Sequence, residues 1–198
     1  MDGSRIRNRP TSRRRRTRAS RWRRRRRRRW SRTSGTMDEV TIQIECGHPE
    51  LAEAIERLRA LAEHVCRRFA EGAICLDLGV VDDSEIRRLE RQFFDQDETT
   101  DVISFDLSEP GEPQRTLCIA VNADEARRQA RRRGHGVETE LALYVVHGLL
   151  HQFGFDDVDP TAAERMHRME DRILDDEGFG VVYERPVRTT DGPPQSKG

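Results

Sequence analysis

The most informative stretch of this chain is HGLLHQFGFDD, residues 147–157. Its histidines, His147 and His151, stand four apart in a run that predicts a helix, so both side chains leave one face, about 6 Å apart along the axis. A glycine three residues later can end that helix in the left-handed conformation. The chain then reverses, and Asp156 or Asp157 can return a carboxylate toward the histidines. Two imidazoles, one carboxylate and an open position are the components of a hydrolytic metal site.

Two alternative interpretations of these histidines are a structural role in the core and a role in a zinc peptidase. A lone histidine in an apolar helix is usually a core residue. Here, however, Leu149, Leu150 and Phe153 lie off the histidine face, and a glycine stop precedes the acids, which favours metal ligands. Zinc peptidases use His-Glu-x-x-His, in which the general base directly follows the first ligand. Gly148 stands at that position, so peptide hydrolysis by this mechanism is not expected.

Residues 1–36 differ in composition from the rest of the chain. They hold 17 of its 36 basic residues and, in Asp2, one of its 36 acidic residues. Such a segment cannot build an apolar core, so we expect a disordered, Arg-rich tail. The other 19 basic and 35 acidic residues give 37–198 a net charge of −16, although the whole chain is formally neutral. This acidic body should repel nucleic acid, which restricts RNA contact to the tail or to a local basic patch such as the arginines within 127–133.

Three interpretations of the tail remain open. It could be an arm that neutralises nucleic-acid phosphates, or a targeting segment, although it lacks a clear amphipathic period. We favour the third, in which 1–36 is not translated and Met37 is the true start, because a strand is expected from Val40. The composition at the other end predicts a flexible tail over 181–198. One compact domain over 37–180 is therefore expected.

Cysteine spacing and hydropathy favour a cytoplasmic protein. The four cysteines are scattered without Cys-x-x-Cys spacing, which indicates reduced thiols and argues against a cysteine zinc site. No run of the sequence is apolar enough for a membrane span, and no signal-peptide core is visible. We expect no membrane partner.

The hydrophobic pattern predicts strands and helices in mixed order. Strands are expected over 40–44, 74–81, 102–105 and 117–121, and helices over 51–69, 84–93, 123–133, 138–153 and 160–177. There is no Gly-rich phosphate loop and no internal repeat. The expected fold is a single α+β domain: a small mixed sheet of about four strands packed against several helices, with the metal-bearing helix in the C-terminal part.

Two motifs carry a family resemblance. Residues 147–156 read His-Gly-x-Leu-His-x-x-Gly-Phe-Asp, and upstream stand LERQFF at 89–94 and TDVISF at 100–105. Together they resemble the signature helix, strand and metal motif of the YbeY family of rRNA-maturation endoribonucleases, over about residues 38–177. The resemblance implies a small α+β fold, one zinc ion held by three histidines, and single-strand-specific cleavage in ribosomal RNA maturation and quality control. It also implies ribosomal RNA, the small ribosomal subunit and ribosome-associated proteins as partners.

The ligand set departs from the family at its third member. By position, His147 and His151 are the first two ligands, and Asp157 stands where the family has its third histidine. A carboxylate binds zinc at a similar length, so the expected site is one Zn²⁺ on His147, His151 and Asp157. Such a site should be less Lewis-acidic and should tolerate harder ions such as Mn²⁺. The alternatives are that Asp157 is a solvated turn residue, or that Asp156 or His167 supplies the third ligand.

A second departure concerns the cleft. The family's Tyr-Arg pair becomes Phe93-Phe94, and its Asn becomes Glu90, so the cleft arginine that would bind phosphate is missing. Arg91 or an arginine of 127–133 could compensate, and no catalytic base is assigned. The expected function is metal-assisted hydrolysis of RNA phosphodiesters. The alternatives are a metal-stabilised ribosome-assembly factor that binds without cutting and, as a weaker candidate, another metal-dependent hydrolase.

Overall fold

The computed structural model describes residues 39–109 and 111–183, and the sequence predictions for 1–36 and 184–198 lie outside these ranges. Its four strands form one mixed sheet in the order β1-β2-β4-β3. They are β1 (Val40–Cys46), β2 (Ile74–Val81), β3 (Val102–Asp106) and β4 (Arg115–Asn122). The strands β1, β2 and β4 are parallel, whereas β3 pairs antiparallel with β4. The α+β class and the mixed four-stranded sheet predicted from the sequence are confirmed.

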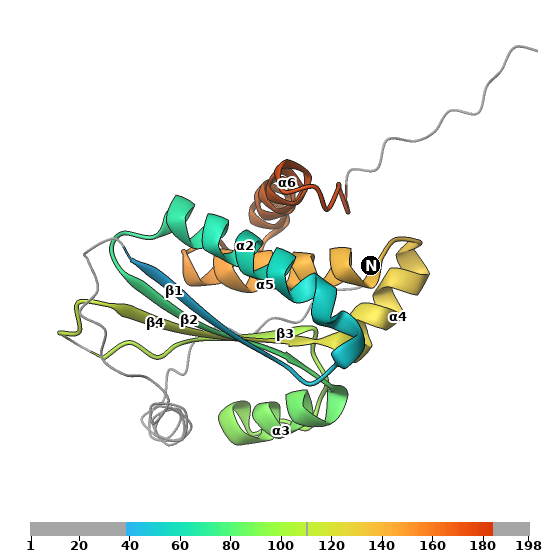
Figure 1. The fold of residues 1–198 in the computed structure, drawn as a ribbon, viewed down its shortest axis with the longest axis horizontal. Helices are drawn as coiled ribbons and strands as arrows, with labels where there is room; N and C mark the ends of the chain where they lie inside the picture. Colours follow the sequence, from blue (N-terminus) through green and yellow to red (C-terminus); the bar gives the residue numbers. More distant parts are fainter. Residues whose placement is uncertain (1–38, 110, 184–198) are drawn as a thin grey trace, which may run out of the picture.

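Helices cover both faces of this sheet (Figure 1). They are α2 (Ala52–Phe69), preceded by the 3-10 turn η1 (Pro49–Leu51), then α3 (Asp83–Phe94), α4 (Ala123–Arg133), α5 (Val137–Gln152) and α6 (Pro160–Asp176). One face carries α2 and α5, with α6 packed on their outer side, and the other face carries α3. The central strand β2 is buried along almost its whole length because both of its faces are covered.

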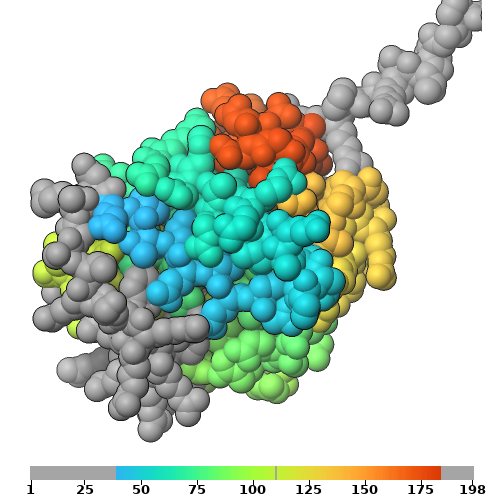
Figure 2. Space-filling model, in the orientation of Figure 1, coloured from blue at the N-terminus to red at the C-terminus, as the bar shows by residue number. Residues whose placement is uncertain are grey.

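The apolar side chains form two clusters, one on each side of the sheet. The larger lies between the sheet, α2 and α5, and the smaller packs α3 against β3 and β4. In α5, every residue from 140 to 151 is buried, which explains why its sequence lacks an amphipathic pattern. The space-filling view shows α2 and β1 crossing the front of the body between α6 and α3 (Figure 2).

The sequence predictions for the helices and strands hold to within a few residues. The strand β4 begins at Arg115, two residues before its expected start at residue 117, because it pairs with Ile74 at the start of β2. Contacts also continue past residue 180, where the flexible tail was expected to follow. Val182 is buried, and its backbone N donates to Asp171 Oδ1 at 2.7 Å. All four cysteines are free thiols, as expected.

None of the described helices is both long and apolar enough to cross a membrane.

Candidate metal centre

The two motif histidines face each other on the buried side of α5. His147 and His151 both lie in the interior, and their Nε2 atoms are 3.3 Å apart. The rings meet edge to face, with centroids 4.7 Å apart. The four-residue spacing therefore brings the two nitrogens to one point, as the helical period predicts.

Asp157 completes the group. After α5 the chain turns at Gly154, whose φ of 92° is in the left-handed region, and Phe155 N donates back to the carbonyl of Leu150 at 3.0 Å. The turn places Asp157 Oδ2 3.9 Å from His147 Nε2, and its Oδ1 3.7 Å from His151 Nε2. One ligand atom from each of the three residues lies within 4.8 Å of the others. This convergence fits a divalent cation bound by two imidazoles and a carboxylate.

The outer nitrogen of each histidine is held by an acceptor. His147 Nδ1 is hydrogen-bonded to Oε1 of Glu170, which projects from α6 and is fully buried. His151 Nδ1 is 3.1 Å from the carbonyl oxygen of Phe155. A proton on each Nδ1 satisfies these acceptors and leaves the Nε2 lone pairs directed at the common centre. Metal-binding histidines show this arrangement, because the outer hydrogen bond fixes both the tautomer and the ring orientation.

The electrostatics of the centre favour a cation. Burial by itself would lower the pKa of His147, but the hydrogen bond and charge of Glu170, with the charges of Asp101 and Asp157, outweigh it and raise this pKa. Burial and the neighbouring His147 lower the pKa of His151. The negative charges of Glu170, Asp101 and Asp157 thus act on the buried histidine pair, and a bound divalent ion would offset these charges.

The alternative third ligands lie elsewhere. Asp156 is exposed, and its Oδ1 accepts from the backbone N of Asp157 at 2.8 Å and of Val158 at 3.2 Å, so it stabilises the turn. The ring of His167 stacks on Tyr183, with centroids 4.0 Å apart, and is outside the ligand group. Of the three candidates considered from the sequence, the structure brings only Asp157 to the histidines.

Sequence reasoning missed Glu170. Its signal was available in α6, where the residue falls on the same helical face as Met166, Ile173 and Leu174, all of them buried. A carboxylate on an apolar face must find a partner, because an unpaired buried charge is costly. The sequence shows that Glu170 needs a partner, but the identity of that partner depends on how α6 packs against α5.

Gly148 has a packing role. A Cβ at this position would lie 3.0 Å from Val102 Cγ2 and 3.3 Å from Ile119 Cγ2, so the residue faces the sheet rather than the ligand group. The glutamate that serves as general base in zinc peptidases is absent from this position, and the packing around Gly148 leaves no room for it. This observation weakens the peptidase alternative further.

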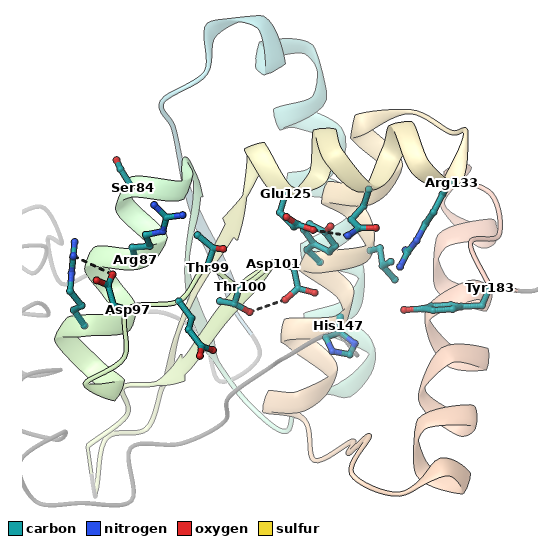
Figure 3. Close-up of a pocket in the computed structure, with 15 residues that line it drawn as sticks. Ser84, Arg87, Asp97, Thr99, Thr100, Asp101, Glu125, Arg133, His147 and Tyr183 are labelled. Atoms are coloured by element: carbon teal, nitrogen blue, oxygen red, sulfur yellow. Dashed lines mark hydrogen bonds and ion pairs between the residues drawn. The ribbon is translucent and has the colours of Figure 1, made fainter. Parts of the chain in front are cut away.

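A groove of about 910 Å³ adjoins the centre at His147 (Figure 3). It is lined by parts of α3, α4 and α5, by the segment before β3 and by Tyr183. Its cationic side chains are Arg87, Arg91 and Arg133, and its carboxylates are those of Asp97, Glu98, Asp101 and Glu125. The mixed charge of this lining suits a ligand that carries both phosphates and hydrogen-bond donors.

The residue at the position of the family's cleft arginine is buried. Phe94 packs in the smaller apolar cluster, and its ring stacks on Phe105 with centroids 5.6 Å apart. Of the arginines considered as substitutes, Arg91 and Arg133 line the groove. Arg128 is paired with Asp83 at 2.8 Å and with Glu125 at 2.7 Å, and it does not itself line the groove.

Comparison with known proteins identifies the family of this chain. Residues 42–178 match the family described as Endoribonuclease YbeY. The Endoribonuclease YbeY of an Anaeromyxobacter species is 35% identical over 141 residues, which are 71% of this chain and 73% of that protein. The Gloeobacter violaceus protein of this name is 41% identical over 122 residues, covering 58% of this chain and 62% of its own. The Myxococcus xanthus protein is 34% identical over 147 residues, covering 72% and 49%.

One solved structure is also similar. The solution structure of TM1509 from Thermotoga maritima is 24% identical, with a TM-score of 0.49, and the match covers 79% of this chain and 100% of that one.

A small α+β domain with a buried histidine pair and a carboxylate beside a groove defines a candidate metallohydrolase. The chain belongs to the YbeY endoribonuclease family, which confirms the resemblance seen in its motifs. It spans about half of the Myxococcus relative and most of the Anaeromyxobacter one.

Proposed function

We propose that this protein is a metal-dependent, single-strand-specific endoribonuclease that acts in ribosomal RNA maturation and ribosome quality control in the cytoplasm. Its partners would be ribosomal RNA, the small ribosomal subunit and ribosome-associated proteins. The observation that carries the proposal is the convergence of His147, His151 and Asp157 at one end of the groove. Membership of the YbeY endoribonuclease family supports endonucleolytic cleavage of RNA as the class of reaction.

The donor set fits one zinc ion. Two imidazole nitrogens and a carboxylate oxygen are the ligands of many catalytic zinc sites, which leave a further position open. When bound here, the metal would lower the pKa of a water molecule and polarise a phosphoryl oxygen of the substrate. The carboxylate makes this site one charge more negative than a three-histidine set, which favours tolerance of Mn²⁺.

The chain's own residues bind and orient the RNA. Arg87, Arg91 and Arg133 line the groove from two helices, so their guanidinium groups can bind successive phosphates. Asp101 is the candidate general base. It lines the groove together with His147, and the backbone N of Val102 donates to its Oδ1 at 2.9 Å, which fixes its orientation (Figure 3).

The decisive test compares metal content and RNA cleavage in matched histidine variants. His147→Ala should lose both bound zinc and cleavage of a single-stranded RNA, because it removes a ligand. His64→Ala, on α2 and outside both the ligand group and the groove lining, should keep both. Zinc would be measured by elemental mass spectrometry and cleavage on single-stranded and duplex substrates. Full cleavage by metal-free His147→Ala would overturn the proposed mechanism.

The same measurement identifies the third ligand. Asp157→Ala should bind clearly less zinc, whereas Asp156→Asn should bind the wild-type amount, because it keeps the oxygen that accepts from the backbone of the turn.

A second candidate function is a ribosome-assembly factor that binds RNA without cutting it. The observation that favours it is Phe94, which replaces a cationic cleft residue with a buried aromatic ring. This candidate predicts stoichiometric zinc and RNA binding in the wild-type protein but no cleavage of any single-stranded substrate. The cleavage assay above therefore separates the two functions.

A further inference from the structure

An aromatic side chain closes the end of the groove beside His147. Tyr183 lines the groove, and its ring lies below Arg133 with the hydroxyl directed toward His147 (Figure 3). The residue is 36% exposed, and in the described part of the chain the only other large hydrophobic residue as exposed as this is Val158. A tyrosine that is exposed inside a groove offers its ring to whatever the groove binds.

The position of this ring is fixed by contacts with α6. The backbone N of Tyr183 donates to both oxygens of Asp171, at 3.1 and 3.2 Å, and the preceding residue, Val182, is buried. The ring of His167 stacks on Tyr183 with centroids 4.0 Å apart and an interplanar angle of 16°. One face of the tyrosine is therefore covered by α6. A ring held in this way loses little further conformational freedom when a ligand packs on its exposed part.

The guanidinium of Arg133 lies over the same ring. Its central carbon is 5.9 Å from the Tyr183 centroid, and its Nη1 donates to Glu140 Oε1 at 3.1 Å. Because Glu140 is fully buried, this ion pair anchors the arginine at the edge of the groove, where its side chain remains 34% exposed. A fixed cation and a fixed aromatic ring thus stand together next to a metal ligand.

This pair of groups matches the chemistry of a nucleotide. Proteins bind single-stranded RNA by stacking bases on aromatic rings and by placing cationic side chains along the phosphates. We propose that Tyr183 and Arg133 form a subsite for the nucleotide next to the scissile phosphate, in which the base packs on the exposed part of the tyrosine ring and the phosphate binds the guanidinium. The inference rests on the proposed endoribonuclease function and names two substrate-positioning residues for it.

The contact can be detected without cleavage. The full chain would be mixed with a single-stranded RNA containing 5-iodouridine and irradiated at once, and the crosslinked residues would be mapped by mass spectrometry. We expect a crosslink at Tyr183 that disappears in Tyr183→Leu, which keeps an apolar side chain but removes the flat ring. Crosslinks that map elsewhere in the chain and never at Tyr183 would overturn the subsite.

Cleavage kinetics provide the second measurement. Tyr183→Leu should raise KM by about tenfold with little change in kcat, as expected for the loss of one stacked base, whereas Tyr183→Phe should resemble wild type. Arg133→Gln should also raise KM. Its matched control is Arg131→Gln, which makes the same change of charge at an exposed position on the same helix, outside the groove lining. Circular dichroism would verify that each variant is folded.

Different results would overturn the nucleotide subsite and the endoribonuclease function. A Tyr183 crosslink on RNA that no wild-type preparation cleaves would leave the subsite standing and overturn the endoribonuclease function. Efficient cleavage with wild-type KM in both Tyr183→Leu and Arg133→Gln would leave the endoribonuclease function standing and overturn the subsite.

Discussion

Glu170 is the buried carboxylate that accepts the Nδ1 proton of His147 from the neighbouring helix. In Glu170→Gln the amide oxygen can still accept this proton, but the negative charge that makes the imidazole a stronger ligand is lost. We therefore expect zinc affinity to fall by about 10- to 100-fold, the usual effect of removing such an outer partner. Competition titration with a chromophoric chelator would measure the change.

The matched control for this variant is Glu164→Gln. Glu164 lies on the same helix, is exposed, and pairs with Arg168 at 3.1 Å. It should leave zinc affinity unchanged. Equal affinities in both variants would show that Glu170 has a packing role only.

Asp157 illustrates what can be predicted from a short motif and what cannot. The four-residue spacing and the glycine stop predicted that His147, His151 and a following carboxylate converge, because local backbone geometry determines it. Choosing between Asp156 and Asp157 required the actual turn, in which Asp156 accepts backbone N–H groups. The partnership of Glu170 with His147 lay beyond sequence reasoning because the two residues are 23 positions apart and meet only through tertiary packing.

The helix α5 carries both histidines, and its position depends on close contact with the sheet at Gly148. In Gly148→Ala the new methyl group would meet Val102 and Ile119 side chains at 3.0 and 3.3 Å. Overpacking of this kind costs about 1–3 kcal/mol, against a gain of about 1 kcal/mol in helix propensity. We expect the free energy of unfolding, measured by urea titration, to fall by up to about 2 kcal/mol net. Gly47→Ala is the control, since nothing lies within 4 Å of its added Cβ. An unchanged stability for Gly148→Ala would mean that α5 can shift at no cost.

At the scale of elements, periodicity predicted nearly every helix and strand, because each follows a regular apolar pattern. The strand β4 was predicted too short, since the first residues of the strand, Arg115 and Thr116, are polar and only partly buried. Contacts with α6 also continue beyond residue 180, where the sequence predicts a flexible tail. Tyr183 belongs to the domain through Asp171 and His167, two contacts from α6 that its polar, Pro-containing surroundings in the sequence do not indicate.

The charge of the whole molecule is divided between two parts of opposite sign, which should act differently on RNA. Residues 1–36 carry 17 arginines, whereas 37–198 carries a net charge of −16. The ligand group and the groove lining, in contrast, all lie between Ser84 and Tyr183. Affinity for RNA and the chemistry at the metal centre should therefore be separable by truncation.

We expect the fragment 37–198 to keep the zinc content and the kcat of the full chain, because every group at the site remains. Its RNA affinity should be weaker and should depend less on salt, since fewer arginines would release counterions from the phosphates. The slope of log affinity against log salt concentration, measured for both proteins by fluorescence anisotropy, reports the number of these contacts. Equal slopes would exclude the tail as an RNA-binding arm. Loss of zinc from the fragment would instead show that the tail supports the metal centre.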